Sequence, residues 1–128
     1  MSVRIGVNPI VWSNDDLRSL GGDTPLETCL REAHEAGYDG IELGHKFPRD
    51  AATLTAVVGA HGLALVSGWY SSALLQRDVA AELGALRPHL DLLKALGCGV
   101  LILCETTGAV HDNRARPLST RPVLTEAK

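Results

Sequence analysis

The chain has 128 residues, of which 45% are hydrophobic, and its formal net charge at pH 7 is −3. This length and apolar content predict one domain with a buried core. The mild charge excludes the basic surface of a nucleic-acid-binding protein, and no apolar run reaches the roughly 20 residues of a membrane-spanning helix.

Short apolar segments alternate with helical patterns along the first half of the chain. Val3 to Asn8 is predicted to be a strand, and a connection rich in glycine, asparagine and aspartate follows it over residues 12–23. The next helix is predicted to begin with a capping box, in which Thr24 caps the helix and Glu27 reaches back to it. A second strand is expected over residues 40–43.

The second half repeats this alternation. A helix is predicted from Asp50 to His61, and a strand over residues 64–67. The third helix is interrupted by Pro88, which predicts a kink or two helical pieces. The apolar side chains that define this helix by their spacing are Val79, Leu83, Leu86, Leu90 and Leu93. Residues 100–104 form a continuous apolar run, which is typical of a strand covered on both faces.

A glycine follows each of the three predicted helices and precedes the next strand by a few residues. Gly37, Gly62 and Gly97 occupy these positions, where only glycine adopts the left-handed cap conformation at little cost. The resulting β-α-β-α-β-α-β order predicts an α/β fold with a parallel sheet. Residues 109–128 are polar, contain prolines and lack periodicity, so we expect an irregular tail there.

Functional residues of parallel α/β folds lie just past the carboxyl ends of the strands. The candidates for binding a substrate at these ends are Asn8, Trp12, Glu42, Lys46, Trp69, Tyr70 and Glu105. Simpler interpretations also fit the sequence. Glu42 can also be interpreted as a solvated residue at a strand end, and Lys46 as part of an ordinary charged turn. The Trp69–Tyr70 pair is interpreted as a pocket wall or as packing. No histidine pair has metal-ligand spacing, and no complete catalytic set emerges.

These strand-end residues belong to longer motifs that resemble a known family. The motifs GGDTPLETCL, KFPRD and SGWYS are similar to those of the inosose dehydratases, within the xylose-isomerase-like sugar isomerases and epimerases. The resemblance covers about residues 3–124 and corresponds to the N-terminal half of that family. It implies a (β/α)8 TIM barrel, which needs about 250 residues. The chain is therefore expected to be a single partial barrel domain over residues 1–128.

The resemblance also implies a reaction, the elimination of water from 2-keto-myo-inositol (scyllo-inosose) in inositol catabolism. It implies Mn²⁺ or Co²⁺ as the metal and glutathione as an accessory, with metal ligands on later strands, so no metal ligand is assigned to this chain. Glu42, Lys46, Trp69 and Glu105 match the family's strand-end motifs and are assigned to binding the polyhydroxylated ring. His45 stands where asparagine is expected, and its role stays open.

Half a barrel is expected to behave differently from a whole one. We expect a truncated chain with little or no dehydratase activity that self-associates through the exposed edges of its first and fourth strands. The alternatives are a non-catalytic sugar-binding module and a sugar isomerase or epimerase of the same superfamily. The expected partner is a small keto-inositol or polyol, with no nucleic acid or membrane. Three cysteines without paired spacing and an N-terminus without a secretory pattern predict a cytoplasmic protein.

Overall fold

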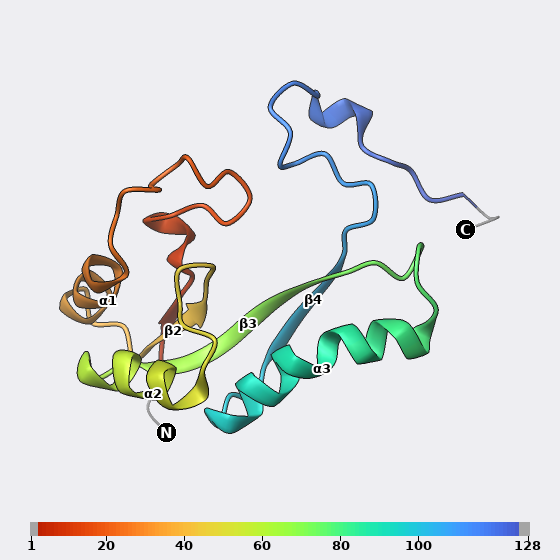
Figure 1. Ribbon diagram of the computed structural model, residues 1–128. Helices are drawn as coiled ribbons and strands as arrows, with labels where there is room; N and C mark the ends of the chain where they lie inside the picture. The colour runs from red at the N-terminus through yellow and green to blue at the C-terminus, as the bar shows by residue number, and fades with distance from the viewer. Residues whose placement is uncertain (1–2, 126–128) are drawn as a thin grey trace.

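The computed structural model describes residues 3–125, which form one parallel sheet and three α-helices (Figure 1). The strands pair in the order of the sequence, and all three pairs are parallel. They are β1 (Gly6–Val7), β2 (Gly40–Leu43), β3 (Ala64–Ser72) and β4 (Leu101–Glu105). This is the strand order of consecutive units in a (β/α)8 barrel, so the predicted α/β half-barrel is confirmed.

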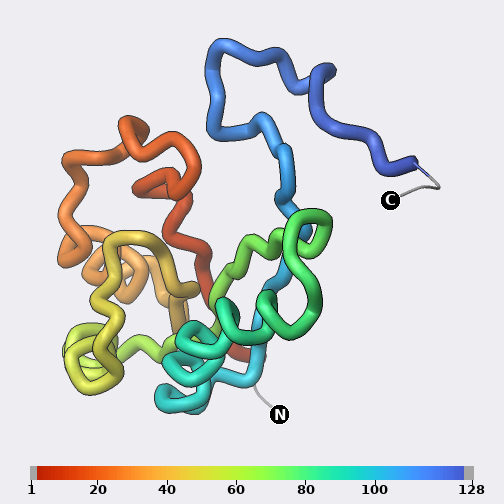
Figure 2. The backbone as a smooth tube through the Cα atoms, turned by 45° about the vertical axis from the view of Figure 1, so that its right-hand side comes forward, coloured from red at the N-terminus to blue at the C-terminus, as the bar shows by residue number. Residues whose placement is uncertain are grey.

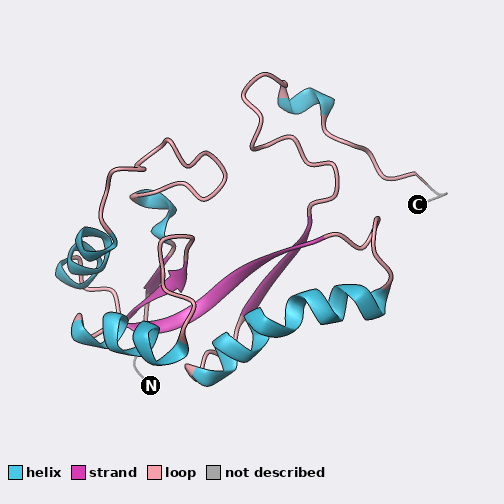
Figure 3. Cartoon of the chain, in the orientation of Figure 1, coloured by secondary structure: helices cyan, strands magenta, loops and turns pink. Residues whose placement is uncertain are grey.

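The helices connect the strands and lie against the sheet (Figure 3). They are α1 (Leu26–Glu35), α2 (Ala51–Ala60) and α3 (Val79–Ala95), with short 3₁₀ helices η1 (Pro9–Val11) and η2 (Leu118–Thr120). Leu30 of α1, Ile41 of β2 and Leu54 of α2 are fully buried at the centre of the hydrophobic core. Burial of these apolar side chains holds the helices on the sheet.

The three predicted helix-ending glycines adopt the expected conformation. Gly37, Gly62 and Gly97 have φ angles of 85°, 67° and 68°, in the left-handed region. Each allows the chain to turn from a helix into the following strand, which confirms the sequence pattern.

The predicted capping box is wrong. Helix α1 begins at Leu26 with Pro25 as its N-cap, and no side chain caps it. Glu27 lies instead 3.1 Å from Nε2 of His61 at the end of α2. The carbonyl oxygen of Thr24 accepts a hydrogen bond from Lys46, so the start of the helix is fixed by a distant lysine rather than by a local cap.

The third helix and the fourth strand differ in part from the sequence predictions. Helix α3 is one continuous helix through Pro88 rather than two pieces, and of its regularly spaced apolar side chains it buries Leu86 and Leu93 while Leu83 is 54% exposed. Strand β4 lies at the edge of the sheet, and its Leu103 is 49% exposed, so the predicted coverage on both faces is wrong.

Strands β1 and β4 each have a neighbouring strand on one side only within residues 3–125. After β4 the chain extends away from the three helices in both views (Figure 1 and Figure 2).

No helix within residues 3–125 is long and apolar enough to cross a membrane. Self-association through the two edges stays a prediction, and light scattering from the purified chain would test it.

A β-bulge interrupts the pairing of β2 with β3. Ile41 pairs with Leu65, but the next residue, Glu42, pairs with Ser67, so Val66 is an extra residue. A Cβ atom on Gly6 would lie 2.7 Å from a Val66 methyl group, and one on Gly40 would lie closer still. The two glycines therefore provide the space that Val66 occupies.

This packing predicts opposite effects for two glycine-to-alanine substitutions. Gly40→Ala should lower the free energy of unfolding by about 1–3 kcal/mol, because the new methyl group overlaps both Val66 and the backbone oxygen of Ala64. Gly84→Ala should raise it by about 0.5–1 kcal/mol, because Gly84 lies inside α3 with nothing within 4 Å of a new Cβ. Urea unfolding followed by circular dichroism measures both, and equal effects would contradict the described packing.

Candidate functional site

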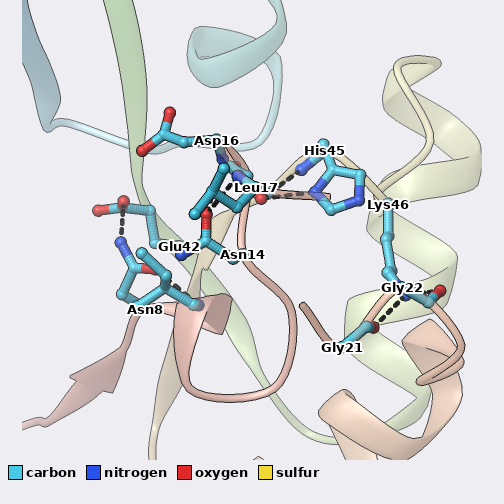
Figure 4. A network of polar contacts seen from close by, with 12 residues as sticks. Asn8, Asn14, Asp16, Leu17, Gly21, Gly22, Glu42, His45 and Lys46 are labelled. Carbon is cyan, nitrogen blue, oxygen red and sulfur yellow. Dashed lines mark hydrogen bonds and ion pairs between the residues drawn. The ribbon is translucent and has the colours of Figure 1, made fainter. Parts of the chain in front are cut away.

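Glu42 is the centre of a buried polar network on the sheet. Glu42 is only 6% exposed, although it carries a carboxyl group. Oε1 accepts a hydrogen bond of 2.6 Å from Nδ2 of Asn8, and Oε2 accepts one of 2.5 Å from Oγ of Ser67 (Figure 4 shows the first). We call these three residues the Glu42 network. They come from the end of β1, from β2 and from β3, and Ser67 was not predicted as a site residue.

Local structure fixes the orientation of both donors. The Asn8 side-chain oxygen accepts a hydrogen bond of 2.8 Å from the backbone of Ile10 at the start of η1, so its NH₂ group is directed at Glu42. The bulge at Val66 places Ser67 opposite Glu42. A buried carboxylate held by two neutral donors keeps lone pairs that can accept hydrogen bonds from ligand hydroxyl groups.

Lys46 follows β2 but does not point at this network. Its ammonium group donates to the carbonyl oxygens of Gly21 at 3.0 Å, Gly22 at 2.7 Å and Thr24 at 2.5 Å. These three bonds use all of its donors. Figure 4 shows the side chain directed at the glycines and away from Asn8 and Glu42. In this arrangement Lys46 holds the connection between β1 and α1 in place.

The same connection is anchored at two further points. Nε1 of Trp12 donates to Glu32 of α1 at 2.7 Å, and Nδ1 of His45 lies 2.6 Å from Oδ1 of Asp15. His45, whose role the sequence left open, is therefore a partner of an aspartate in the β1–α1 connection. Trp12 is turned toward α1 by its own hydrogen bond.

Trp69 and Tyr70 lie inside a strand rather than beyond its end, because β3 continues to Ser72. Successive side chains of a strand point to opposite faces, so Trp69 shares the face of Ser67 and is 47% exposed. The Tyr70 hydroxyl donates to Glu82 of α3 at 2.8 Å. Burial and this hydrogen bond raise the pKa of Tyr70, which keeps its hydroxyl a donor. The structure thus separates Tyr70 from the Glu42 network.

Glu105 ends β4 and organises the loops around it. Its carboxylate accepts hydrogen bonds from the backbone of Thr107 at 2.8 Å, the hydroxyl of Ser72 at 2.9 Å and the backbone of Leu74 at 2.6 Å. Hydrogen bonding from Thr107, and then from Ser72 and Leu74, lowers the pKa of Glu105 to about 2. A carboxylate engaged in this way connects the ends of β3 and β4.

A cavity of about 370 Å³ opens between the connections that follow β1 and β4. Nε2 of His111 lies 3.3 Å from Oδ1 of Asp16 and joins the two connections at one side of it. Sequence reasoning missed this cavity, whose lining residues are Asp15, Asp16, Arg18, Ser71, Thr106, Ala109, His111 and Asp112. The only available signal was the density of polar residues in the connections past the strand ends.

The residues described here do not assemble a metal centre. Nowhere in residues 3–125 do three or more histidine, cysteine, aspartate or glutamate side chains form a group that could hold a metal ion. The donor set therefore does not fit the implied Mn²⁺ or Co²⁺, and no chemical step is assigned to a metal. Metal and glutathione dependence stay predictions.

Comparison with known proteins identifies relatives along almost the whole chain, although no family model matches it. The rhizopine catabolism protein MocC of Rhizobium meliloti is 50% identical over 124 residues, which are 97% of this chain and 38% of that protein. The inosose dehydratase of Geobacillus thermodenitrificans is 34% identical over 125 residues, covering 97% of this chain and 42% of that protein. An inosose dehydratase of Mesomycoplasma hyopneumoniae is also 34% identical, over 124 residues.

The resemblance to inosose dehydratases is therefore confirmed at the level of sequence similarity. The chain spans about two fifths of the length of these curated relatives. Four strands of a parallel α/β sheet are consistent with that share of an eight-stranded barrel.

The environment of Glu105 predicts a pH dependence of stability. Its pKa is lowered from 4.5 to about 2 in the folded state, so its contribution to stability is complete above about pH 4.5 and is lost as the pH falls toward 2. The Glu105→Gln variant should therefore lose less stability than the wild type across this range. Urea midpoints measured between pH 2 and 6 provide the test.

Glu35→Gln on α1 is the matched control for removing one carboxylate, because Glu35 lies on an exposed helix surface. Identical slopes of stability against pH for Glu105→Gln and the wild type would contradict the assigned hydrogen bonds.

Proposed function

We propose that this chain supplies the ring-binding part of a site that acts on a cyclic polyhydroxylated ketone of the keto-inositol type. The observation that carries the proposal is the Glu42 network, in which a buried carboxylate is aimed by donors from two neighbouring strands. The names of the relatives support the substrate class, since two of the three described above are called inosose dehydratases.

The chemistry of the site suits a ring that carries many hydroxyl groups. Each hydroxyl both donates and accepts a hydrogen bond, so a polyol needs both kinds of partner. The Glu42 carboxylate is an acceptor, and the cavity between the connections after β1 and β4 is lined by the cationic side chain of Arg18 and the hydroxyls of Ser71 and Thr106. The exposed ring of Trp69 offers an apolar surface for the C–H face of the substrate.

The proposed reaction is the elimination of water from 2-keto-myo-inositol. Within it, Glu42 and its two donors orient one edge of the substrate, and the β1–α1 connection supplies Asp15, Asp16 and Arg18 to the lining of the cavity. Lys46 contributes by fixing that connection through Gly21, Gly22 and Thr24 rather than by contacting the substrate. The metal chemistry implied by the family is not assigned to residues of this chain.

Isothermal titration calorimetry with 2-keto-myo-inositol tests this proposal directly. The wild-type chain should bind without added metal, and Glu42→Gln should bind more weakly by about 1.5–3 kcal/mol, because a charged acceptor is replaced by an amide. This difference corresponds to roughly a 10- to 150-fold rise in Kd.

Glu82→Gln is the matched control, because Glu82 is equally buried but lies on α3 and bonds Tyr70 instead. It should leave the affinity unchanged. No heat of binding for the wild type, or equal losses in the two variants, would contradict the proposal.

A further inference from the structure

The contact between α3 and β3 contains a histidine whose ring nitrogen is shielded from solvent. We propose that His89 is an acid-sensitive switch, which keeps α3 packed on β3 while its ring is neutral and loosens this contact when the ring takes up a proton. The switch lies on the helix side of the sheet, opposite the face that carries Ser67 and Trp69. It goes beyond the proposed function and does not depend on which ligand the chain binds.

The His89 ring lies directly on the backbone of Gly68. A Cβ atom on Gly68 would lie 3.0 Å from Nε2 and 3.1 Å from Cε1 of His89, and 2.9 Å from a methyl group of Leu93. The absence of a side chain on Gly68 therefore gives the ring its place. The ring of Tyr70, on the same face of β3, has its centroid 5.9 Å from that of His89. The histidine is packed between helix and strand as an uncharged aromatic side chain would be.

Nε2 of His89 has no acceptor for a proton. It is one of three buried side-chain nitrogen or oxygen atoms without a hydrogen bond in the part of the chain that the structure describes. A neutral imidazole can carry its single proton on Nδ1 and leave Nε2 bare, whereas the imidazolium ion carries a proton on both nitrogens. A proton on Nε2 would be a buried donor without a partner and would bring a charge into the contact. The packing therefore favours the neutral ring.

The surroundings of the ring oppose its protonation as well. Burial has the largest effect and lowers the pKa of His89, and the charge of Arg49 lowers it further. The backbone of Gly68 raises the pKa by a smaller amount. Arg49 approaches from the turn before α2, where its guanidinium group donates to the carbonyl oxygen of Gly44 at 3.1 Å. A charged His89 would thus meet a second cation that is held in place.

The other titratable groups at this contact do not supply a counter-charge. From β3, the Tyr70 hydroxyl donates to Glu82 at 2.8 Å. Glu82 is the buried carboxylate of α3, and Nη1 of Arg77 lies 3.3 Å from it. Its charge is already paired, and no carboxylate is among the causes that shift the pKa of His89.

The lowered pKa fixes the sign of the effect on stability. The unfolded chain takes up a proton at His89 with the ordinary pKa of 6.5, and the folded chain does so only at lower pH. The contribution of the neutral ring is therefore complete above about pH 6.5 and is lost as the pH falls below this value. The window of Glu105 is separate, because it begins below about pH 4.5.

NMR of the wild-type chain with labelled histidine rings and backbone amides, titrated from about pH 8 to about pH 5, tests the switch. The His89 ring should titrate below pH 6.5 and below the ring of His34, which is exposed on α1. The opening constant of the α3 amides, obtained from hydrogen exchange, should rise by up to about tenfold for each pH unit below 6.5, because the open form takes up the proton more readily. The α1 amides are the internal reference and should not follow this rise.

Two variants separate the titration of His89 from its packing. His89→Gln cannot titrate and should remove the rise in α3 opening at low pH, whereas His34→Gln is the matched control and should retain it. Arg49→Gln leaves the ring in place but removes the neighbouring charge, so it should move the His89 titration to higher pH. A purely structural role of His89 would not predict this shift.

The wild-type titration decides the matter even where a variant is too unstable to study. Titration of His89 at or above the pH of His34 would overturn the switch. An α3 opening constant that stays unchanged as the pH falls, or that rises equally in α1, would overturn it too. Equal pH dependence in the wild type and in a folded His89→Gln would also contradict it. None of these outcomes depends on whether a keto-inositol binds, so the proposed function is tested separately.

Discussion

The contact of Val66 with Gly6 and Gly40 sets the register in which β3 meets β2, and the geometry of the candidate site depends on it. Gly6 of β1 and Gly40 of β2 have no side chain, and this leaves room for the extra residue of β3, Val66. The extra residue brings a serine, rather than a valine, opposite a buried glutamate. A packing detail among small residues thus decides which polar group the Glu42 carboxylate meets.

Some polar residues at the strand ends hold the loops in place, and others keep acceptor sites available for a substrate. Lys46 uses all three of its donors on backbone carbonyl oxygens of this chain, and Glu105 already accepts three hydrogen bonds. Glu42 has a single neutral partner on each oxygen. Because a ligand must replace or add to existing bonds, the less occupied carboxylate is the better candidate for contact with a substrate.

Much of the fold could be predicted because its signals are local. The cap conformation of Gly37, Gly62 and Gly97 follows from their positions between a helix and a strand, and the parallel order follows from the repeat. The position of Glu42 at a carboxyl strand end was also readable from its own segment. These features depend on a few neighbouring residues.

The features that sequence reasoning missed depend on distant contacts. The role of Ser67 requires Gly6 and Gly40, which belong to other strands. The length of β3, which places Tyr70 against α3 rather than in the site, is set by pairing with β4 as far as Glu105. No local pattern around these residues encodes their partners.

The role of the Glu42 network in substrate binding is tested most directly by NMR mapping of the chain during titration with 2-keto-myo-inositol, with the glutamate carboxyl carbons and the backbone amides labelled. We expect the largest shifts at the Glu42 carboxyl carbon and at the amides of Asn8 and Ser67. Shifts concentrated instead around Tyr70 and Glu82, on the helix face of the sheet, would contradict it.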